Sequence, residues 1–193
     1  MIEKAGGVQG QFVRPGKYAR VERERRFLSA EPPAPSSVTA TRAITDRYLV
    51  GTRLRLRRAA YPDGRSELKL TQKVAIARPG AVQGLITNMY LSPAEYDLLA
   101  SLPAAVLTKT RFSVPPLGVD VFEGPLRGLV LAEAEFTTDE EARSFVPPRE
   151  CVAEVTADVR FTGGRLVTAS RQDLLGWLAD YGLRPWAGGA AGG

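Results

Sequence analysis

The sequence predicts a β-rich α+β fold in which antiparallel strands close into a barrel. Two observations predict it. At least seven segments between residues 17 and 183 alternate polar with apolar residues, the period of a strand, and only three short helices are signalled. Several of the polar faces also carry charges of one sign. Three short helices could not cover the apolar faces of so many strands in an open sheet, so we expect a closed barrel with charged faces inward.

The three helices are predicted from their starts. Ser92 and Glu95 form a capping box with proline at the first helical position, and segment 138–145 begins with a threonine cap and acids in the first turn. Segment 170–181 begins with a serine cap and ends at Gly182. Each is too short to do more than flank the strands.

Turn residues and low-complexity ends set the predicted organisation. We expect hairpin turns at 62–64 (Pro-Asp-Gly) and 163–164 (Gly-Gly). Residues 1–16 are predicted to be a flexible arm and residues 184–193 a flexible tail, because both are rich in glycine and lack a periodic pattern. The segment 17–183 between them is predicted to form one domain.

The charged faces of the strands are the most informative feature of the sequence. Alternating charge is ordinarily the solvated face of a half-buried sheet. Patterns such as Arg-x-Arg-x-Arg and Glu-x-Glu are less ordinary, because a solvated face would mix signs and uncharged polar residues. The charged faces belong to the segments 21–27 (Glu22, Glu24, Arg26), 52–58 (Arg53, Arg55, Arg57), 67–74 (Lys69, Thr71, Lys73), 107–112 (Lys109, Arg111), 129–136 (Glu133, Glu135) and 153–161 (Glu154, Thr156, Asp158, Arg160).

The charges expected to line the inside of the barrel, its lumen, indicate what kind of ligand it binds. Clustered arginines and lysines require an anion, and clustered glutamates require a cation. A triphosphate or polyphosphate carrying a divalent metal supplies both. The basic pI of about 9.6 and the net charge of +5 are consistent with an anionic partner.

Composition limits the chemistry. The chain has no histidine and one cysteine, Cys151, which excludes histidine-based triads and histidine or cysteine zinc sites. Any metal would be held by oxygen ligands, which points to Mg²⁺, Mn²⁺ or Ca²⁺. The single cysteine, the absence of an apolar leader and the lack of a long apolar run predict a cytoplasmic protein with no membrane partner.

The same residues resemble the motifs of a known family. Glu22 to Leu28 resembles the ExExK signature that opens the CYTH domain, the triphosphate tunnel metalloenzyme superfamily. The later motifs follow in order over roughly residues 18–181. They are Leu54-Arg55-Leu56-Arg57, Thr71-Gln72-Lys73, Lys109-Thr110-Arg111, Val119-Asp120-Val121-Phe122, the segment 128–135 that ends in Glu-x-Glu, and Glu154 to Asp158.

The resemblance implies an eight-stranded antiparallel tunnel that cleaves a triphosphate with Mg²⁺ or Mn²⁺. It implies a catalytic set of Glu22, Glu24, Arg26 and Lys73. Phosphate would be bound by Arg53, Arg55, Arg57, Lys73, Lys109 and Arg111, with the choice between the pairs Arg53/Arg55 and Arg55/Arg57 open. Metal would be bound by Glu22, Glu24, Glu133, Glu135, Glu154 and Asp158.

Two departures from the family pattern matter. Arg26 occupies the position where the family has lysine. The charge is kept, but a rigid, planar guanidinium group replaces a compact ammonium group. Many members also have a second Glu-x-Glu, and the corresponding segment 85–91 contains no acid. Either Thr87 and Met89 or Asn88 and Tyr90 occupy those positions. We therefore expect one tightly bound metal.

Three functions are compatible with this sequence. The first is metal-dependent hydrolysis of an inorganic or organic triphosphate. The second is non-catalytic binding of polyphosphate or another phosphorylated ligand in the same tunnel. The third, a nucleic-acid-binding barrel, is disfavoured because the acidic strands would repel a phosphate backbone and no exposed aromatics interleave with the basic strands. The apolar outer faces also allow a homodimer.

Overall fold

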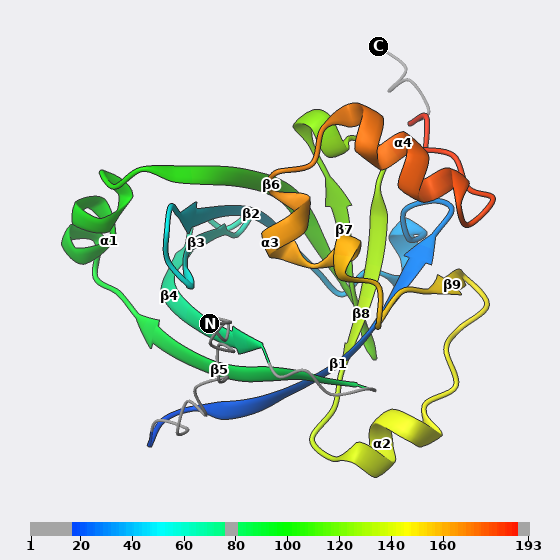
Figure 1. Cartoon of the computed structure of the whole chain (residues 1–193), viewed down its shortest axis with the longest axis horizontal. Helices are drawn as coiled ribbons and strands as arrows, with labels where there is room; N and C mark the ends of the chain where they lie inside the picture. Colours follow the sequence, from blue (N-terminus) through cyan, green and yellow to red (C-terminus); the bar gives the residue numbers. More distant parts are fainter. Residues whose placement is uncertain (1–16, 76–80, 189–193) are drawn as a thin grey trace, which may run out of the picture.

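A computed structural model describes residues 17–75 and 81–188, and its elements are arranged around a ring of strands (Figure 1). The strands are β1 (Arg20–Ser29), β2 (Ala40–Leu49), β3 (Leu54–Ala60), β4 (Ser66–Ala75), β5 (Val82–Tyr90), β6 (Ala104–Val114), β7 (Leu117–Phe122), β8 (Val130–Glu135) and β9 (Cys151–Glu154). The helices are α1 (Pro93–Ala100), α2 (Asp139–Ser144), α3 (Gly163–Leu166) and α4 (Arg171–Ala179), with 3-10 turns η1 (Pro35–Ser37), η2 (Gly124–Leu126) and η3 (Val159–Phe161).

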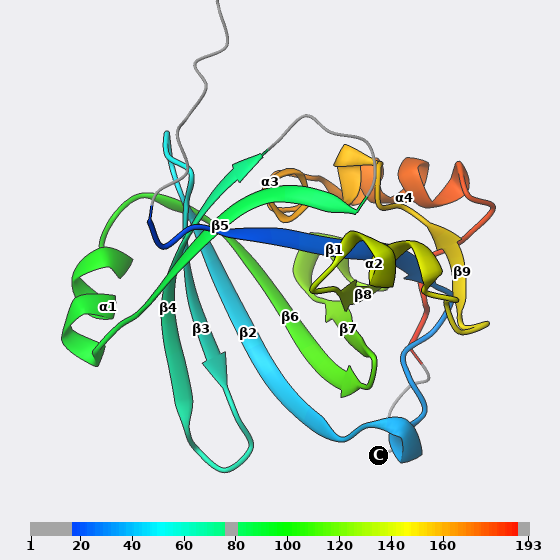
Figure 2. The same ribbon diagram turned by 90° about the horizontal axis from the view of Figure 1, so that it is seen from below.

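The sheet closes on itself. Its order is β5-β4-β3-β2-β6-β7-β8-β1-β9, and an additional antiparallel pairing of β1 with β5 completes an eight-stranded barrel. The first part of β1 pairs with β5 and its last part pairs with β9, with a bulge between Glu22 and Arg23. Figure 2 shows β1 next to β5, where the barrel closes. The predicted closed antiparallel barrel is confirmed.

Strand register determines which side chains face the lumen. Directly opposed residues in neighbouring strands lie on the same face of a sheet. Asp46 is opposite Arg57, Arg111 is opposite Asp120, and Arg26 is opposite Glu133. The charged faces predicted for β1, β3, β4, β6 and β8 therefore point inward together.

The C-terminal segment packs on one end of the barrel. Leu28, Phe122 and Leu131, from the inward faces of three strands, share a buried cluster with Phe161 and Leu166. Leu174 and Leu178 of α4 complete it. A second apolar cluster, around Phe27, Val119 and Val130, lies on the outer face of β1, β7 and β8.

The predicted helix starts are confirmed. Ser92 with Glu95, Thr138 with Glu141, and Ser170 with Asp173 form reciprocal capping boxes at α1, α2 and α4. Each satisfies backbone N–H groups that have no partner within the helix. The predicted turn at 62–64 joins β3 to β4, with Gly64 at a φ of 85°.

Two sequence predictions near the C-terminus are wrong. The strand expected over 153–161 ends at Glu154. The carboxylate of Asp158 accepts a hydrogen bond from the backbone N–H of Arg160 and caps η3, a local interaction that competes with strand pairing. The Gly163-Gly164 pair begins α3 instead of forming a hairpin turn.

The predicted tail is partly packed. The backbone N–H of Trp186 donates to the carbonyl of Gly128, 2.8 Å away. Gly128 has a φ of 90°, and a Cβ there would lie 2.7 Å from the Trp186 carbonyl oxygen. Part of the predicted tail thus lies against the segment before β8, and its flexibility stays a prediction. Residues 189–193 and the predicted arm 1–16 lie outside the described residues.

No helix in the described ranges is both long enough and apolar enough to span a membrane.

Candidate functional site

One wall of the lumen is built by β2, β3 and β4 around a buried aspartate. Asp46 is 1% exposed and accepts two hydrogen bonds of 2.7 Å from the Nε and Nη2 atoms of Arg57. The Nε atom of Arg55 lies 3.6 Å from the same carboxylate. Burial alone would raise the pKa of Asp46, but these guanidinium groups lower it to about 2.

A second wall, on β6, β7 and β8, is built around Asp120, which is fully buried. Asp120 accepts hydrogen bonds from Lys109 Nζ at 2.5 Å and from Arg111 Nε and Nη2 at 2.6 Å. Arg111 also donates to the carboxylate of Glu133. Gly118 lies beside the Arg111 side chain, where an added Cβ would be in ordinary van der Waals contact with it at 3.6 Å.

The acidic side of the lumen lies on β1 and β8. Glu24 is 7% exposed, and its ion pair with Arg26 is long, at 3.7 Å. Burial, followed by repulsion from Glu133 and Glu22, raises the pKa of Glu24 to about 7. Burial would also raise the pKa of Glu133, but the charges of Arg111, Lys109 and Lys73 hold it below its ordinary value. Glu22 accepts a 2.7 Å hydrogen bond from Lys73.

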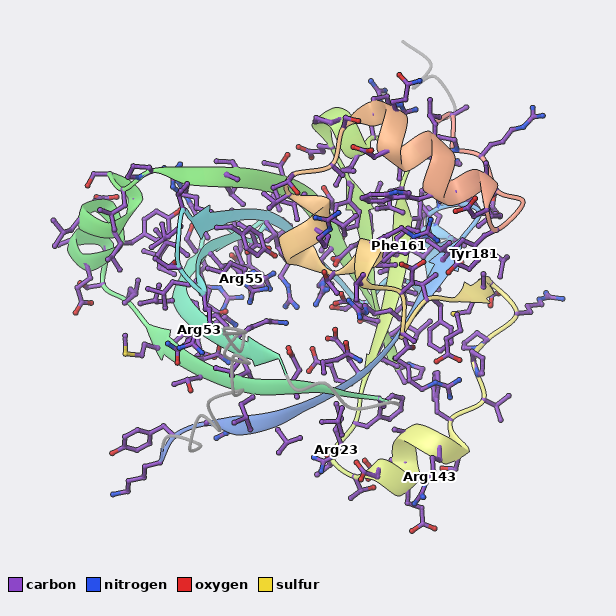
Figure 3. The ribbon with its side chains drawn as sticks, in the orientation of Figure 1. Arg23, Arg53, Arg55, Arg143, Phe161 and Tyr181 are labelled. Atoms are coloured by element: carbon purple, nitrogen blue, oxygen red, sulfur yellow. The ribbon has the colours of Figure 1, made fainter. Side chains whose placement is uncertain are left out.

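Arg55 has unused hydrogen-bonding capacity among the lumen cations. Its Nη2 atom donates a long bond of 3.3 Å to Thr71, and its buried Nε atom has no hydrogen-bond partner. Figure 3 shows Arg55 projecting into the ring from the β3 side, with Arg53 nearby. Arg53 precedes β3 and is exposed. The structure thus separates Arg55 from Arg57, whose guanidinium group is already bound by Asp46.

Arg26 is held by the C-terminal segment. Its guanidinium group donates to the backbone carbonyls of Phe161 and Thr156 and to the side chain of Gln83, at 2.8 to 3.1 Å. The side chain is buried, so its contacts tie β1 to the segment after β9. These contacts leave only its Nε atom without a hydrogen-bond partner.

Two acids of the predicted metal set lie outside the lumen. Glu154 is opposite Phe27 on the outer face and makes a bidentate pair with Arg25 at 2.6 and 2.9 Å. Asp158 binds Arg160 at 2.7 Å and the hydroxyl of Tyr181 at 2.9 Å. Tyr181 and Phe161 lie on the α4 side, away from the centre of the ring (Figure 3). The prediction grouped these acids because it assumed one continuous strand.

The remaining acids of the predicted metal set face the lumen. Glu135 is opposite Glu24 at the exposed end of β8, and Glu133 is opposite Arg26. Within residues 17–75 and 81–188, no three acidic side chains already converge as a metal site. The carboxylates of Glu22 and Glu133 nevertheless both repel that of Glu24, and a bound divalent cation would relieve this repulsion. Their oxygen ligands suit Mg²⁺ or Mn²⁺.

Sequence reasoning named Thr71, Asn88 and Asp120 without giving any of them a role, and it did not consider Asp46. Thr71 is fully buried and donates to the side-chain oxygen of Asn88 at 2.8 Å. Asn88 and Ile86 therefore share the inward face of β5, and Met89 is 52% exposed. Asp46 could have been found from the alternation Ile44-x-Asp46-x-Tyr48 in β2, a segment whose faces were not assigned.

Comparisons with known proteins found similar solved structures. No protein-family model matches the sequence. No curated protein matches it either. Two solved structures of a protein named NE1496 match. One, described as a hypothetical protein, has 26% identity and a TM-score of 0.52 over 77% of this chain and 99% of that chain. The other, described as an inorganic triphosphatase, has 24% identity and a TM-score of 0.52 over 78% and 96%.

The barrel has the strand number, pairing and charged interior that the sequence resemblance implied. The structural neighbours agree with that resemblance, and the chain has the fold of a CYTH domain.

Proposed function

We propose that the lumen binds the phosphate chain of a triphosphate together with a divalent metal and hydrolyses it. The observation that carries the proposal is the convergence of cations from β3, β4 and β6 on a lumen whose β1 and β8 side carries glutamates. The similarity to NE1496, described as an inorganic triphosphatase, supports the choice of substrate class.

Phosphate oxygens would be bound by the predicted basic set: Arg53, Arg55, Arg57, Lys73, Lys109 and Arg111. Arg55 is the best placed for first contact, because its Nε atom has no hydrogen-bond partner and its Nη2 bond to Thr71 is long. Charge-assisted hydrogen bonds of this kind are the strongest that a phosphate chain forms with a protein. Fixed cations also stabilise the charge that develops in phosphoryl transfer.

The metal would be held by Glu22, Glu24, Glu133 and Glu135, and Glu154 and Asp158 are left out because of their positions. When bound, Mg²⁺ or Mn²⁺ would polarise the phosphoryl oxygens and acidify water. A bound cation would lower the pKa of Glu24 from its value of about 7 without metal, because it offsets the repulsion from Glu133 and Glu22, so this carboxylate would be ionised as a ligand. The proton of the attacking water would be accepted by a carboxylate of the lumen, because the chain contains no histidine.

The test is phosphate release from tripolyphosphate, thiamine triphosphate and a nucleoside triphosphate with Mg²⁺, Mn²⁺ or Ca²⁺. We expect metal-dependent release from at least one substrate. Glu133→Gln should lower activity and alter metal dependence, while Glu154→Gln, its matched outer-face control, should behave as wild type. Absence of release under every condition would reject the hydrolase.

A second function, binding without hydrolysis, has one observation in its favour. Gly84, Ile86, Asn88 and Tyr90 share the inward face of β5, so this strand supplies no carboxylate to that wall. Calorimetry separates the two functions. Tripolyphosphate binding in the presence of metal without any phosphate release would favour the binder.

A further inference from the structure

Two buried aspartates in the lumen have no role in the proposed reaction. Asp120 is fully buried and Asp46 is 1% exposed. Each faces inward from a strand of the basic wall, and each contacts two of the cations assigned to phosphate. Carboxylates repel phosphate, so their presence among phosphate-binding cations requires an explanation.

Asp120 occupies the donors that an anion would need. Both of its oxygens are used, one by Arg111 Nε and the other by Arg111 Nη2 and Lys109 Nζ, at 2.5 to 2.6 Å. Lys109 is 6% exposed and Arg111 is 8% exposed, so solvent contributes little to compensating their charges and Asp120 is a main partner of both. Burial lowers the pKa of Lys109, and the charge of Asp120 opposes that effect.

Asp46 has the same arrangement on the neighbouring wall. It binds the Nε and Nη2 atoms of Arg57, and its carboxylate also lies 3.6 Å from Arg55. The two aspartates come from different strands, β2 and β7, and they serve different cations. The pairing of a buried aspartate with lumen cations therefore occurs twice, at independent positions.

A bidentate carboxylate resembles a phosphate group in the oxygens that it presents to a guanidinium fork. We propose that Asp120 and Asp46 are resident counter-ions, which position Lys109, Arg111 and Arg57 in the empty lumen and compete with the incoming anion for them. The identity of that anion as a triphosphate rests on the proposed function.

This role differs from a purely structural one in a measurable way. A structural ion pair lost by mutation lowers stability equally with and without ligand. A resident counter-ion, once removed, leaves buried cations that bind an added anion more tightly than before. The two roles therefore predict opposite changes in affinity for the anion.

The experiment compares wild type with Asp120→Asn, which keeps the side-chain shape and removes the charge. The probe is tripolyphosphate without metal, and the readouts are melting temperature and calorimetric affinity. We expect the melting temperature of the variant without ligand to fall by on the order of 10 °C. Its affinity for tripolyphosphate should rise about tenfold, because one repulsive charge is gone, and the ligand should raise its melting temperature more than that of wild type.

Matched variants separate charge from packing. Asp120→Glu keeps the charge and should restore part of the lost stability without any gain in affinity. Asp180→Asn removes an ion pair with Arg160 outside the lumen and should leave tripolyphosphate affinity unchanged. Asp46→Asn provides the same comparison on the other wall, and it serves if Asp120→Asn does not fold.

The outcomes distinguish this proposal from the proposed function. Unchanged or weaker tripolyphosphate affinity in the folded Asn variant would overturn the counter-ion role, even if wild type hydrolyses triphosphate. Tighter affinity in the variant, with no phosphate release by wild type, would support the counter-ion role and reject the hydrolase. If neither wild type nor the Asn variant binds tripolyphosphate, both proposals are rejected.

Discussion

Asp120 and Glu24 are both buried carboxylates of one lumen, yet their surroundings are opposite. Asp120 accepts three hydrogen bonds from two cations, whereas the ion pair of Glu24 with Arg26 is 3.7 Å long and two other glutamates repel it. Asp46 on the basic side has a pKa of about 2, and Glu24 on the acidic side has a pKa of about 7. Partners, more than burial, decide whether a lumen carboxylate is charged.

The difference shows which charged groups of the lumen already have a close partner in the absence of ligand. On the basic side, Asp46 and Asp120 hold Arg57, Lys109 and Arg111 in place before any anion arrives, while Arg55 keeps a buried Nε atom without a hydrogen-bond partner. On the acidic side, Glu24 has only a long ion pair of 3.7 Å with Arg26, and a bound metal ion would give its carboxylate a closer cation.

The largest effect is expected from Arg111→Ala. This guanidinium group binds both Asp120 and Glu133, so its removal leaves one buried and one half-buried carboxylate with fewer partners. Loss of one partner of a buried pair typically costs about 3 to 5 kcal/mol of unfolding free energy. Urea unfolding measures this, and a loss below about 1 kcal/mol, the size typical of a surface pair, would contradict the buried network.

The next effect is a pH dependence carried by Glu24. Its pKa is about 7 in the folded protein against an ordinary value of 4.5, so the folded state binds more protons between these values. Stability should therefore decrease as pH rises through that window, by on the order of 2 to 3 kcal/mol. The lowered pKa values of Asp46 and Glu133 affect stability only at lower pH.

Glu24→Gln should flatten this profile, as measured by urea unfolding at pH 4.5, 6 and 7.5. Added Mn²⁺ should stabilise wild type more at the highest pH, where the carboxylate is free to bind it. An unchanged slope in Glu24→Gln would show that another group titrates.

A comparison of Arg55→Ala with Arg57→Ala should separate binding from stability. Arg55 has a buried Nε atom without a hydrogen-bond partner, so its loss should weaken tripolyphosphate binding by about 1.5 to 3 kcal/mol with little change in stability. Arg57→Ala leaves Asp46 without its bidentate partner and should lower stability as well. Calorimetry and thermal melting of both variants check this, and equal effects would contradict the distinction.

The smallest effect is expected from Glu154→Gln. Its pair with Arg25 lies on the outer face, where ion pairs contribute about 0 to 1 kcal/mol. Metal stoichiometry and tripolyphosphate affinity should match wild type. If this variant binds fewer metal ions than wild type, Glu154 is a metal ligand after all.

The sequence predicted the barrel and most of the lumen because strand alternation is a local property. Arg55, Lys73, Lys109, Arg111 and Glu133 face inward as their spacing indicated. The same reasoning misplaced Glu154 and Asp158, because alternation continues through residue 161 in the sequence although the strand ends at Glu154. Local hydrogen bonds of the Asp158 carboxylate decided that ending.

What the sequence determined by itself was the period of the strands, the starts of three helices and the signs of the inward charges. Only the tertiary structure decided which charges meet. Asp120 reaches Arg111 and Lys109 because β7 pairs with β6 in one register, and Arg57 reaches Asp46 because β3 pairs with β2. The ionisation of a buried group depends on distances of a few ångströms to its partners. Pairing register sets those distances, and no single strand carries that information.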